Sequence, residues 1–92
     1  MITQQFIYYV GENNNTKQLE TDKIKAVLNK AIDGYTLSRA VGFWKGTEEK
    51  TAIIKIVGIN KNKAEQIAKD LKRELQQNSV LLETTFNQIK FI

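Results

Sequence analysis

The sequence contains no cysteine, no histidine and no proline. Without cysteine it has no disulfide and no thiol nucleophile, and without histidine it has no imidazole base and no cysteine- or histidine-ligated zinc. Because proline is absent, glycine and asparagine provide the breaks between elements. Acidic residues show no metal-binding spacing, and no phosphate-binding glycine loop is present. We therefore expect no metal, no cofactor, no catalytic residue and no enzymatic activity.

Long hydrophobic runs are also missing. The longest apolar stretch near the start, Phe6 to Val10, has only five residues, and no basic segment precedes it. A secretory signal needs an apolar stretch of about 7–15 residues, and a membrane-spanning helix needs about 20. The sequence therefore predicts a cytoplasmic protein with no membrane association.

What is present is the composition of a small globular protein. The chain has 92 residues, of which 41% are hydrophobic and 26% charged. A chain of this length seals one hydrophobic core, so we expect a single domain over residues 1–92. The net charge of +4 is mildly basic and far from that of a nucleic-acid-binding tail.

Hydrophobic periodicity divides the chain into six elements. A helix beginning at a Thr21 cap carries apolar residues at helical spacing, and Asp33-Gly34 ends it. A second helix begins at an Asn62–Glu65 capping box and ends near residue 77. Strands are predicted over residues 5–10, 35–45, 51–59 and 80–86, with the hairpin turn at residues 46–49.

The order β-α-β-β-α-β predicts an α+β fold of the ferredoxin-like kind. In that sandwich a four-stranded antiparallel sheet carries both helices on one face. Right-handed crossovers place the first and third strands in the centre.

Both faces of the predicted sheet are apolar. Phe6, Tyr8 and Val10 alternate with Ile7 and Tyr9, and the third strand repeats this pattern. Two helices can cover one face only, and a large uncovered apolar patch usually marks an interface. We therefore expect a homo-oligomer rather than a monomer that exposes an apolar sheet, with an interface that includes Tyr8, Ile54, Ile56 and Leu81.

The hairpin between residues 34 and 46 is the most distinctive stretch. It holds the only tryptophan, flanked by glycines that permit close backbone approach. We expect Tyr35, Arg39, Trp44 and Lys45 to contact a ligand or partner. The alternatives are that Trp44 folds back as hairpin core, and that Arg39 pairs across an interface with a Glu such as Glu49 or Glu83.

Positive charge gathers on the second helix, at Lys61, Lys63, Lys69, Lys72 and Arg73. These side chains either contact phosphates or form a solvated face. A nucleic-acid-binding module that uses the basic second helix or the open sheet face is thus the alternative function. On the sheet Tyr8 or Tyr9 could stack on a base, but the third strand has no aromatic residue, which weakens this reading.

The chain resembles the PII-like superfamily, which includes the PII signalling proteins and CutA. The resemblance rests on the order of elements and on three features of the sequence. Two of these features are Glu49, which opens the third strand, and the segment that opens the last strand, Gln77-Asn78-Ser79-Val80-Leu81-Leu82. The third is the hairpin segment Gly34-Tyr35-Thr36-Leu37-Ser38-Arg39-Ala40-Val41-Gly42-Phe43-Trp44-Lys45-Gly46. It implies a non-catalytic homo-oligomer, a trimer rather than a dimer, that binds a small ligand or protein partner in clefts between subunits.

The basic hairpin residues favour an anionic ligand for such a cleft. A small enzyme of the dimeric α+β barrel type is a further alternative. It would have to rely on Arg39, the tyrosines and the carboxylates for its chemistry.

Overall fold

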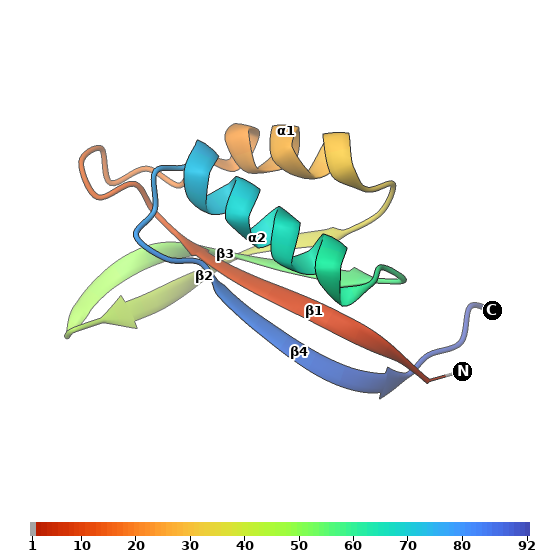
Figure 1. Ribbon diagram of the computed structural model, residues 1–92. Coiled ribbons are helices and arrows are strands. Elements are labelled where there is room, and N and C mark those ends of the chain that lie inside the picture. The colour runs from red at the N-terminus through yellow and green to blue at the C-terminus, as the bar shows by residue number, and fades with distance from the viewer. Residues whose placement is uncertain (1) are drawn as a thin grey trace.

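The computed structural model describes the backbone of residues 2–92 and the side chains of residues 3–92. Its elements are β1 (Ile2–Gly11), α1 (Thr21–Ala31), β2 (Thr36–Trp44), β3 (Thr47–Val57), α2 (Lys61–Glu74) and β4 (Leu81–Gln88). The four strands form one antiparallel sheet in the order β2-β3-β1-β4. Both helices lie on the same face of this sheet (Figure 1). The predicted ferredoxin-like fold, with β1 and β3 in the centre, is confirmed.

The core lies between the helices and the sheet face that they cover. Alternate residues of the central strands point into it because successive strand side chains face opposite ways. They pack against one apolar stripe from each helix. The buried set is Phe6, Tyr8, Val10, Ile24, Leu28, Ala52, Ile54, Ile56, Ala64, Ile67, Leu71 and Leu75. The Tyr8 hydroxyl donates a hydrogen bond to the Ala64 carbonyl at 2.8 Å, so this buried polar group is satisfied.

The start of α2 differs from the sequence prediction by two residues. Asn60, not Asn62, is the N-cap, and its side chain accepts a hydrogen bond from the Lys63 amide at 2.8 Å. Asn60 has an extended backbone and comes two residues after Gly58, which has a positive φ angle. The predicted capping box at Asn62 is therefore wrong. The turn at Gly58 lets the helix begin earlier in the chain than the Asn62–Glu65 spacing indicated.

Two other predicted boundaries also shift. Thr21 is the first residue of α1 rather than its cap, and its hydroxyl donates a hydrogen bond to the Leu19 carbonyl at 3.4 Å. The hairpin turn lies at Lys45 and Gly46, which both have positive φ angles, and not at residues 46–49. Two such residues make the tight turn whose twist suits a two-residue hairpin.

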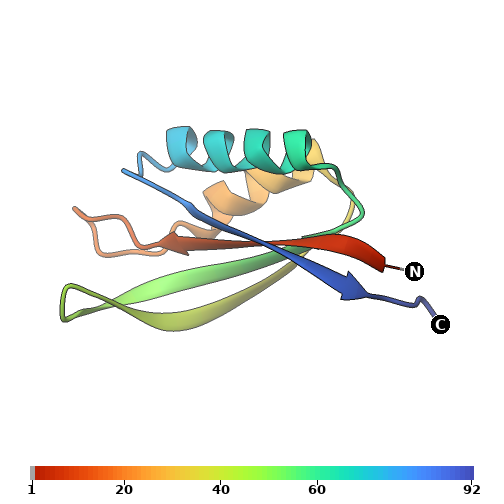
Figure 2. The ribbon, with the colours of Figure 1, turned by 60° about the horizontal axis from the view of Figure 1, so that its bottom comes forward.

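The sheet is longer than the helix layer. Figure 2 shows the β2–β3 hairpin reaching out from under the helices at one end, and the end of β4 reaching out at the other. The molecule accordingly measures 42 Å along its longest axis against 22 Å along its shortest. Both overhanging ends expose large apolar side chains, namely Val41, Phe43, Trp44 and Leu81 at the hairpin end and Phe86, Phe91 and Ile92 at the other.

Candidate functional site

The sheet face turned away from the helices, called here the open face, carries apolar side chains. Ile7 and Tyr9 of β1 lie on it beside Ile53 and Val57 of β3. All four are partly exposed, whereas their strand neighbours on the other face are buried. The prediction that both sheet faces are apolar is therefore confirmed, and the open face lacks a covering layer within residues 2–92.

The residues predicted to form the oligomer interface need correction. Tyr8, Ile54 and Ile56 are at most 1% exposed, because they point under the helices into the core. They cannot contact a second subunit through the open face. Leu81 is 63% exposed and lies opposite Tyr9 in the β1–β4 pairing. The prediction that apolar residues of β1 and β3 alternate between the two sheet faces is correct. For both strands, however, the helix-covered face and the open face were interchanged.

A shallow pocket of about 400 Å³, called here the sheet-face pocket, lies on the open face at the hairpin end. Its floor comes from the strands, and its rim from the loops before α1 and after α2. The lining residues are Tyr9, Gly11, Asn14, Gly42, Phe43, Trp44, Glu49, Thr51, Gln77, Asn78, Ser79 and Leu81. Ligand pockets commonly combine apolar walls with a few fixed polar groups, and this lining has both.

Two glycines shape the floor of the sheet-face pocket. A Cβ atom at Gly11 would lie 3.1 Å from the Glu49 Oε1 atom, and one at Gly42 would lie 2.6 Å from the Thr51 Oγ1 atom. The side chains of Glu49 and Thr51 therefore occupy the space that these glycines leave free. The glycines allow a carboxylate and a hydroxyl to lie flat across the neighbouring strands.

The charge of the sheet-face pocket is negative. Glu49 is the one charged residue among the side chains that line it.

Tyr9, which also lines the pocket, has a hydrogen-bond partner outside it. The Tyr9 hydroxyl donates a hydrogen bond to Glu83 Oε1 at 3.3 Å. Partial desolvation, together with the charge and hydrogen bond of Glu83, raises the pKa of Tyr9. The phenol thus stays protonated and remains a donor over the whole physiological range.

Of the four residues predicted to contact a ligand, Trp44 alone lines the sheet-face pocket. It is 67% exposed and is not hairpin core, and the Lys45 ammonium lies 5.8 Å from its ring centroid. Tyr35 precedes β2 at the opposite end of the strand and donates a hydrogen bond to Asn29 Oδ1 at 2.9 Å. The structure therefore does not bring Tyr35 and Trp44 together.

Arg39 also lies away from the sheet-face pocket. It is opposite Ala52 on the helix-covered side of β2, and its Nη2 atom donates to Thr21 Oγ1 at 3.3 Å. Within one chain Arg39 pairs with neither Glu49 nor Glu83, because both carboxylates lie on the open face; a pairing across a subunit interface stays a prediction. Arg39 instead joins the middle of β2 to the start of α1.

Sequence reasoning missed Glu49 and Tyr9 as pocket residues. Glu49 was assigned to a turn, although it lies within β3 opposite Gly42. A usable signal was the glycine pair itself, because a strand glycine often marks a close approach by another group. Tyr9 could have been identified by assigning Ile7 and Tyr9 of β1 to the open face, in place of their neighbours Phe6, Tyr8 and Val10.

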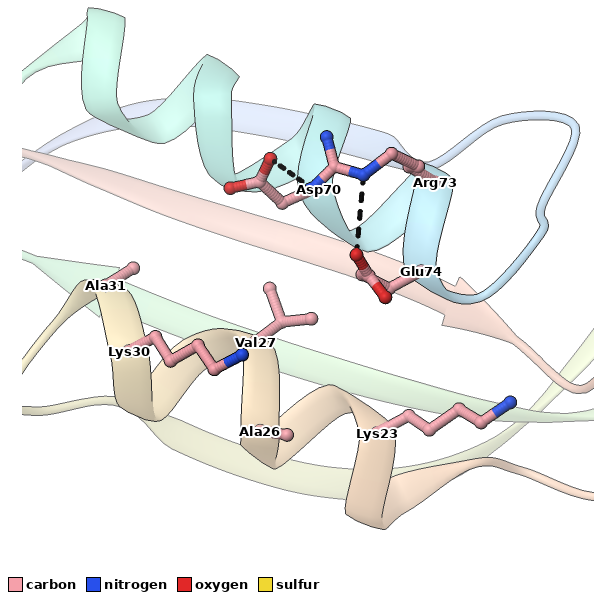
Figure 3. A pocket seen from close by; sticks show the side chains of 8 residues that line it. All are labelled: Lys23, Ala26, Val27, Lys30, Ala31, Asp70, Arg73 and Glu74. Atoms are coloured by element: carbon pink, nitrogen blue, oxygen red, sulfur yellow. Dashed lines mark hydrogen bonds and ion pairs between the residues drawn. The ribbon is translucent and has the colours of Figure 1, made fainter.

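A second concavity, of about 410 Å³, lies between the outer surfaces of α1 and α2. Figure 3 shows Lys23 and Lys30 along α1 facing a cluster of charged side chains on α2. Arg73 bridges Asp70 at 3.2 Å and Glu74 at 3.4 Å, so its guanidinium is already neutralised. This groove is a solvated charge network with both signs represented.

The net positive charge nonetheless belongs to the helices. Together α1 and α2 carry eight basic and four acidic side chains, a net charge of +4 that equals the net charge of the whole chain. The strands and loops are therefore neutral on balance. The helix layer therefore carries the surplus of positive charge.

Residues 2–92 have neither a cluster of metal-binding side chains nor a membrane-spanning helix. No three Asp or Glu side chains of this part of the chain gather closely enough to hold a metal ion. Across the same residues, neither helix has the length and apolarity that crossing a membrane requires.

No protein-family model matches the sequence, and no curated protein matches it. Solved structures do match the fold. A DUF3240 family protein from Shewanella baltica OS155 superposes with a TM-score of 0.71 and 16% identity, over 100% of this chain and 99% of that one. A phage SAM lyase in its apo state gives a TM-score of 0.67 and 22% identity, over 92% of this chain and 81% of that one. At these identities the likeness supports the ferredoxin-like fold.

Proposed function

We propose that the protein is a non-catalytic, PII-like homo-oligomer that binds a small ligand in the sheet-face pocket, at a cleft between subunits. The observation that carries the proposal is the position of this pocket, which lies at one end of an uncovered apolar sheet face. A second subunit on the open face would bury Ile7, Tyr9, Ile53 and Leu81. The same contact would turn a shallow pocket into an enclosed one.

The chemistry of the sheet-face pocket favours a ligand with a positive or neutral polar group beside flat apolar parts. An anionic ligand was expected from Arg39 and Lys45, but neither residue lines the pocket and Glu49 would repel it. The exposed indole of Trp44 and the phenol of Tyr9 offer surfaces for stacking and for cation–π contact. Glu49 offers a counter-charge.

The first ligand to test is SAM (S-adenosylmethionine), because a phage SAM lyase shares this fold. SAM has an adenine ring and a sulfonium cation, which suit an aromatic wall and a carboxylate. The same similarity supports a second candidate, an enzyme that cleaves SAM, with Glu49 as the sole carboxylate in the pocket. Binding without turnover and turnover itself are distinguished by following the fate of the ligand.

The test is titration calorimetry of the purified protein with SAM, followed by chromatography of the incubated mixture. We expect saturable binding to wild type, a loss of at least tenfold in affinity in Trp44→Ala and Glu49→Gln, and intact SAM afterwards. Phe91→Ala is the matched control, because Phe91 is an exposed aromatic residue far along the chain from the pocket. Breakdown of SAM that Glu49→Gln abolishes would establish the enzyme instead.

The positive net charge of the helices favours the helix layer as the surface of the nucleic-acid alternative. It predicts that affinity for a single- or double-stranded oligonucleotide falls steeply with salt, with a slope set by the phosphates contacted. Replacing Lys69 and Lys72 by Gln should then reduce that slope. Absence of any salt-dependent binding removes this function and leaves the helix lysines as a solvated face.

A further inference from the structure

The two helices leave a groove on the side of the protein opposite to the open face. This groove, called here the helix groove, has a volume of about 410 Å³ and a floor of small apolar side chains, namely Ala26, Val27 and Ala31 of α1. Figure 3 shows the Val27 side chain directed from α1 toward α2. Val27 and Ala31 also pack against the core, which holds the floor in place. The distance between packed helices depends on the side chains at their contact, so a floor of small residues lets a third helix lie close.

The α1 wall of the helix groove is basic. It presents Lys23 and Lys30, which are both exposed. Lys23 forms an ion pair with Glu20 at 2.7 Å, whereas Lys30 forms none with the side chains of residues 3–92. The two lysines are two helical turns apart, which is about 10 Å along the axis. A molecule that lies along this wall can therefore place one acidic group beside each lysine.

The α2 wall of the helix groove has its own counter-charges. Arg73 forms ion pairs with Asp70 at 3.2 Å and with Glu74 at 3.4 Å, which leaves this wall with one net negative charge. An occupant should therefore be acidic on the flank toward α1 and neutral on the flank toward α2. A nucleic acid fits this pattern poorly, because its phosphates follow one another along each strand and would also meet the two carboxylates.

A second copy of the chain fits the helix groove poorly as well. The two helices together carry eight basic and four acidic side chains. Two helix layers placed face to face would bring like charges together, and this repulsion opposes their association. The charge of the helix layer instead favours a partner that is acidic.

We infer that the helix groove docks an acidic amphipathic helix of a protein partner. An amphipathic helix laid in a groove is a recurrent mode of peptide recognition. Its apolar stripe lies on the floor, and two carboxylates two turns apart on one flank pair with Lys23 and Lys30. The helix groove and the sheet-face pocket are on opposite sides of the sheet, so each leaves the other free. The inference thus goes beyond the proposed function and does not depend on the binding of SAM.

A synthetic helix tests this inference by fluorescence anisotropy. Helices shorter than about 12–15 residues are marginal in water, so the labelled peptide has about 20 residues. This flank peptide carries an apolar stripe of Leu and Ala, two Glu two turns apart on one flank, and Gln at the other positions. The matched peptide has the same composition and the same stripe, but its two Glu lie opposite the stripe, on the side that faces away from the protein.

We expect saturable binding of the flank peptide to the wild-type protein. The matched peptide should bind about fivefold more weakly, because it lacks two exposed ion pairs. Lys30→Glu should weaken the flank peptide about tenfold, since it turns an attraction into a repulsion. A flank peptide with Lys in place of both Glu should instead prefer Lys30→Glu to wild type.

Lys25→Glu is the control variant, because Lys25 is an exposed lysine of the same helix that does not line the helix groove. It changes the net charge by the same amount as Lys30→Glu and should alter the affinity less than about twofold. Circular dichroism verifies that both variants are folded.

The contrary outcomes each identify a different account of the helix groove. No saturable binding of the flank peptide to wild type, or equal weakening by Lys25→Glu and Lys30→Glu, overturns the inference. Tighter binding of a DNA oligonucleotide than of the flank peptide, lost in Lys30→Glu, also overturns it and assigns the groove to a polyanion. A lower assembly mass of Lys30→Glu by light scattering overturns it as well, because the groove is then a contact between copies.

Discussion

The Thr51 hydroxyl occupies the space that a side chain at Gly42 would need, since a Cβ atom there would lie 2.6 Å from Oγ1. The two residues are on neighbouring strands of the β2–β3 hairpin and face the same side of the sheet. This contact fixes one wall of the sheet-face pocket. It also explains why the hairpin that carries Trp44 has a glycine in the middle of a strand.

Replacing Gly42 by alanine should therefore destabilise the protein. Overpacking in a fitted site costs about 1–3 kcal/mol, and we expect a value near the lower limit because the Thr51 side chain can rotate. Urea denaturation measures the free energy of unfolding. In a Thr51→Ala background the same substitution should cost much less, so the two changes are not additive. Gly34→Ala is the control, because nothing lies within 4 Å of a Cβ at residue 34.

The cap of α2 gives a test between the sequence prediction and the structure. Asn60→Ala removes the hydrogen bond that the Lys63 amide donates and should cost about 1 kcal/mol of stability. Asn62→Ala changes an exposed residue inside the helix and should have little effect or stabilise slightly. Thermal unfolding of the two variants measures both effects. Greater loss in Asn62→Ala would contradict the observed helix start.

Element order and strand order could be predicted because the hydrophobic periods of helices and strands differ, and because crossover handedness leaves few topologies. The face assignment of β1 and β3 could not be predicted in the same way. When Ile53 and Ile54 are equally apolar, alternation says that they face opposite ways but not which one faces the helices. Burial in the folded protein decides it: Ile54 is 0% exposed and Ile53 is partly exposed.

The candidate site was harder to predict than the fold. Trp44 was found because a single tryptophan beside glycines is conspicuous in a sequence. Glu49 and Tyr9 were not identified, because their place in the pocket depends on strand register. Gly11 pairs with Thr51, and this register places the Glu49 carboxylate against Gly11 of β1. Arg39 was misplaced for a related reason, since its partner Thr21 is 18 residues away and meets it only when α1 packs on the sheet.

The two isoleucines also give a test of the open face. Ile54→Asp places a charge in the core and should unfold the protein, because an unpaired buried carboxylate costs several kcal/mol. Ile53→Asp should leave circular dichroism and monomer stability nearly unchanged but reduce the mass of the assembly. Size-exclusion chromatography with light scattering measures that mass. A folded Ile53→Asp variant with the wild-type mass would show that the open face is not an interface.

The buried phenol of Tyr8 predicts a pH dependence of stability. Burial raises the pKa of Tyr8 from 10.0 to about 12. Between these pH values the unfolded chain has lost this proton while the folded protein keeps it, so the contribution of Tyr8 is fully present below pH 10 and is lost as pH rises toward 12.

Tyr8→Phe should therefore show a smaller loss of stability than wild type between these pH values. At neutral pH the same variant should be less stable by about 1 kcal/mol, because it lacks the hydrogen bond to Ala64. Urea denaturation at several pH values compares the two proteins, and lysine deprotonation affects both equally. Parallel pH curves would contradict the burial of this hydroxyl.

Native mass spectrometry of wild-type protein, purified without denaturants, tests the central claim most directly. It reports the number of subunits and any small molecule that stays bound to them. We expect a closed homo-oligomer, a trimer by the PII-like resemblance, with a bound mass that Glu49→Gln reduces. A bare monomer at every protein concentration would contradict the account, and the open face would then need a different partner.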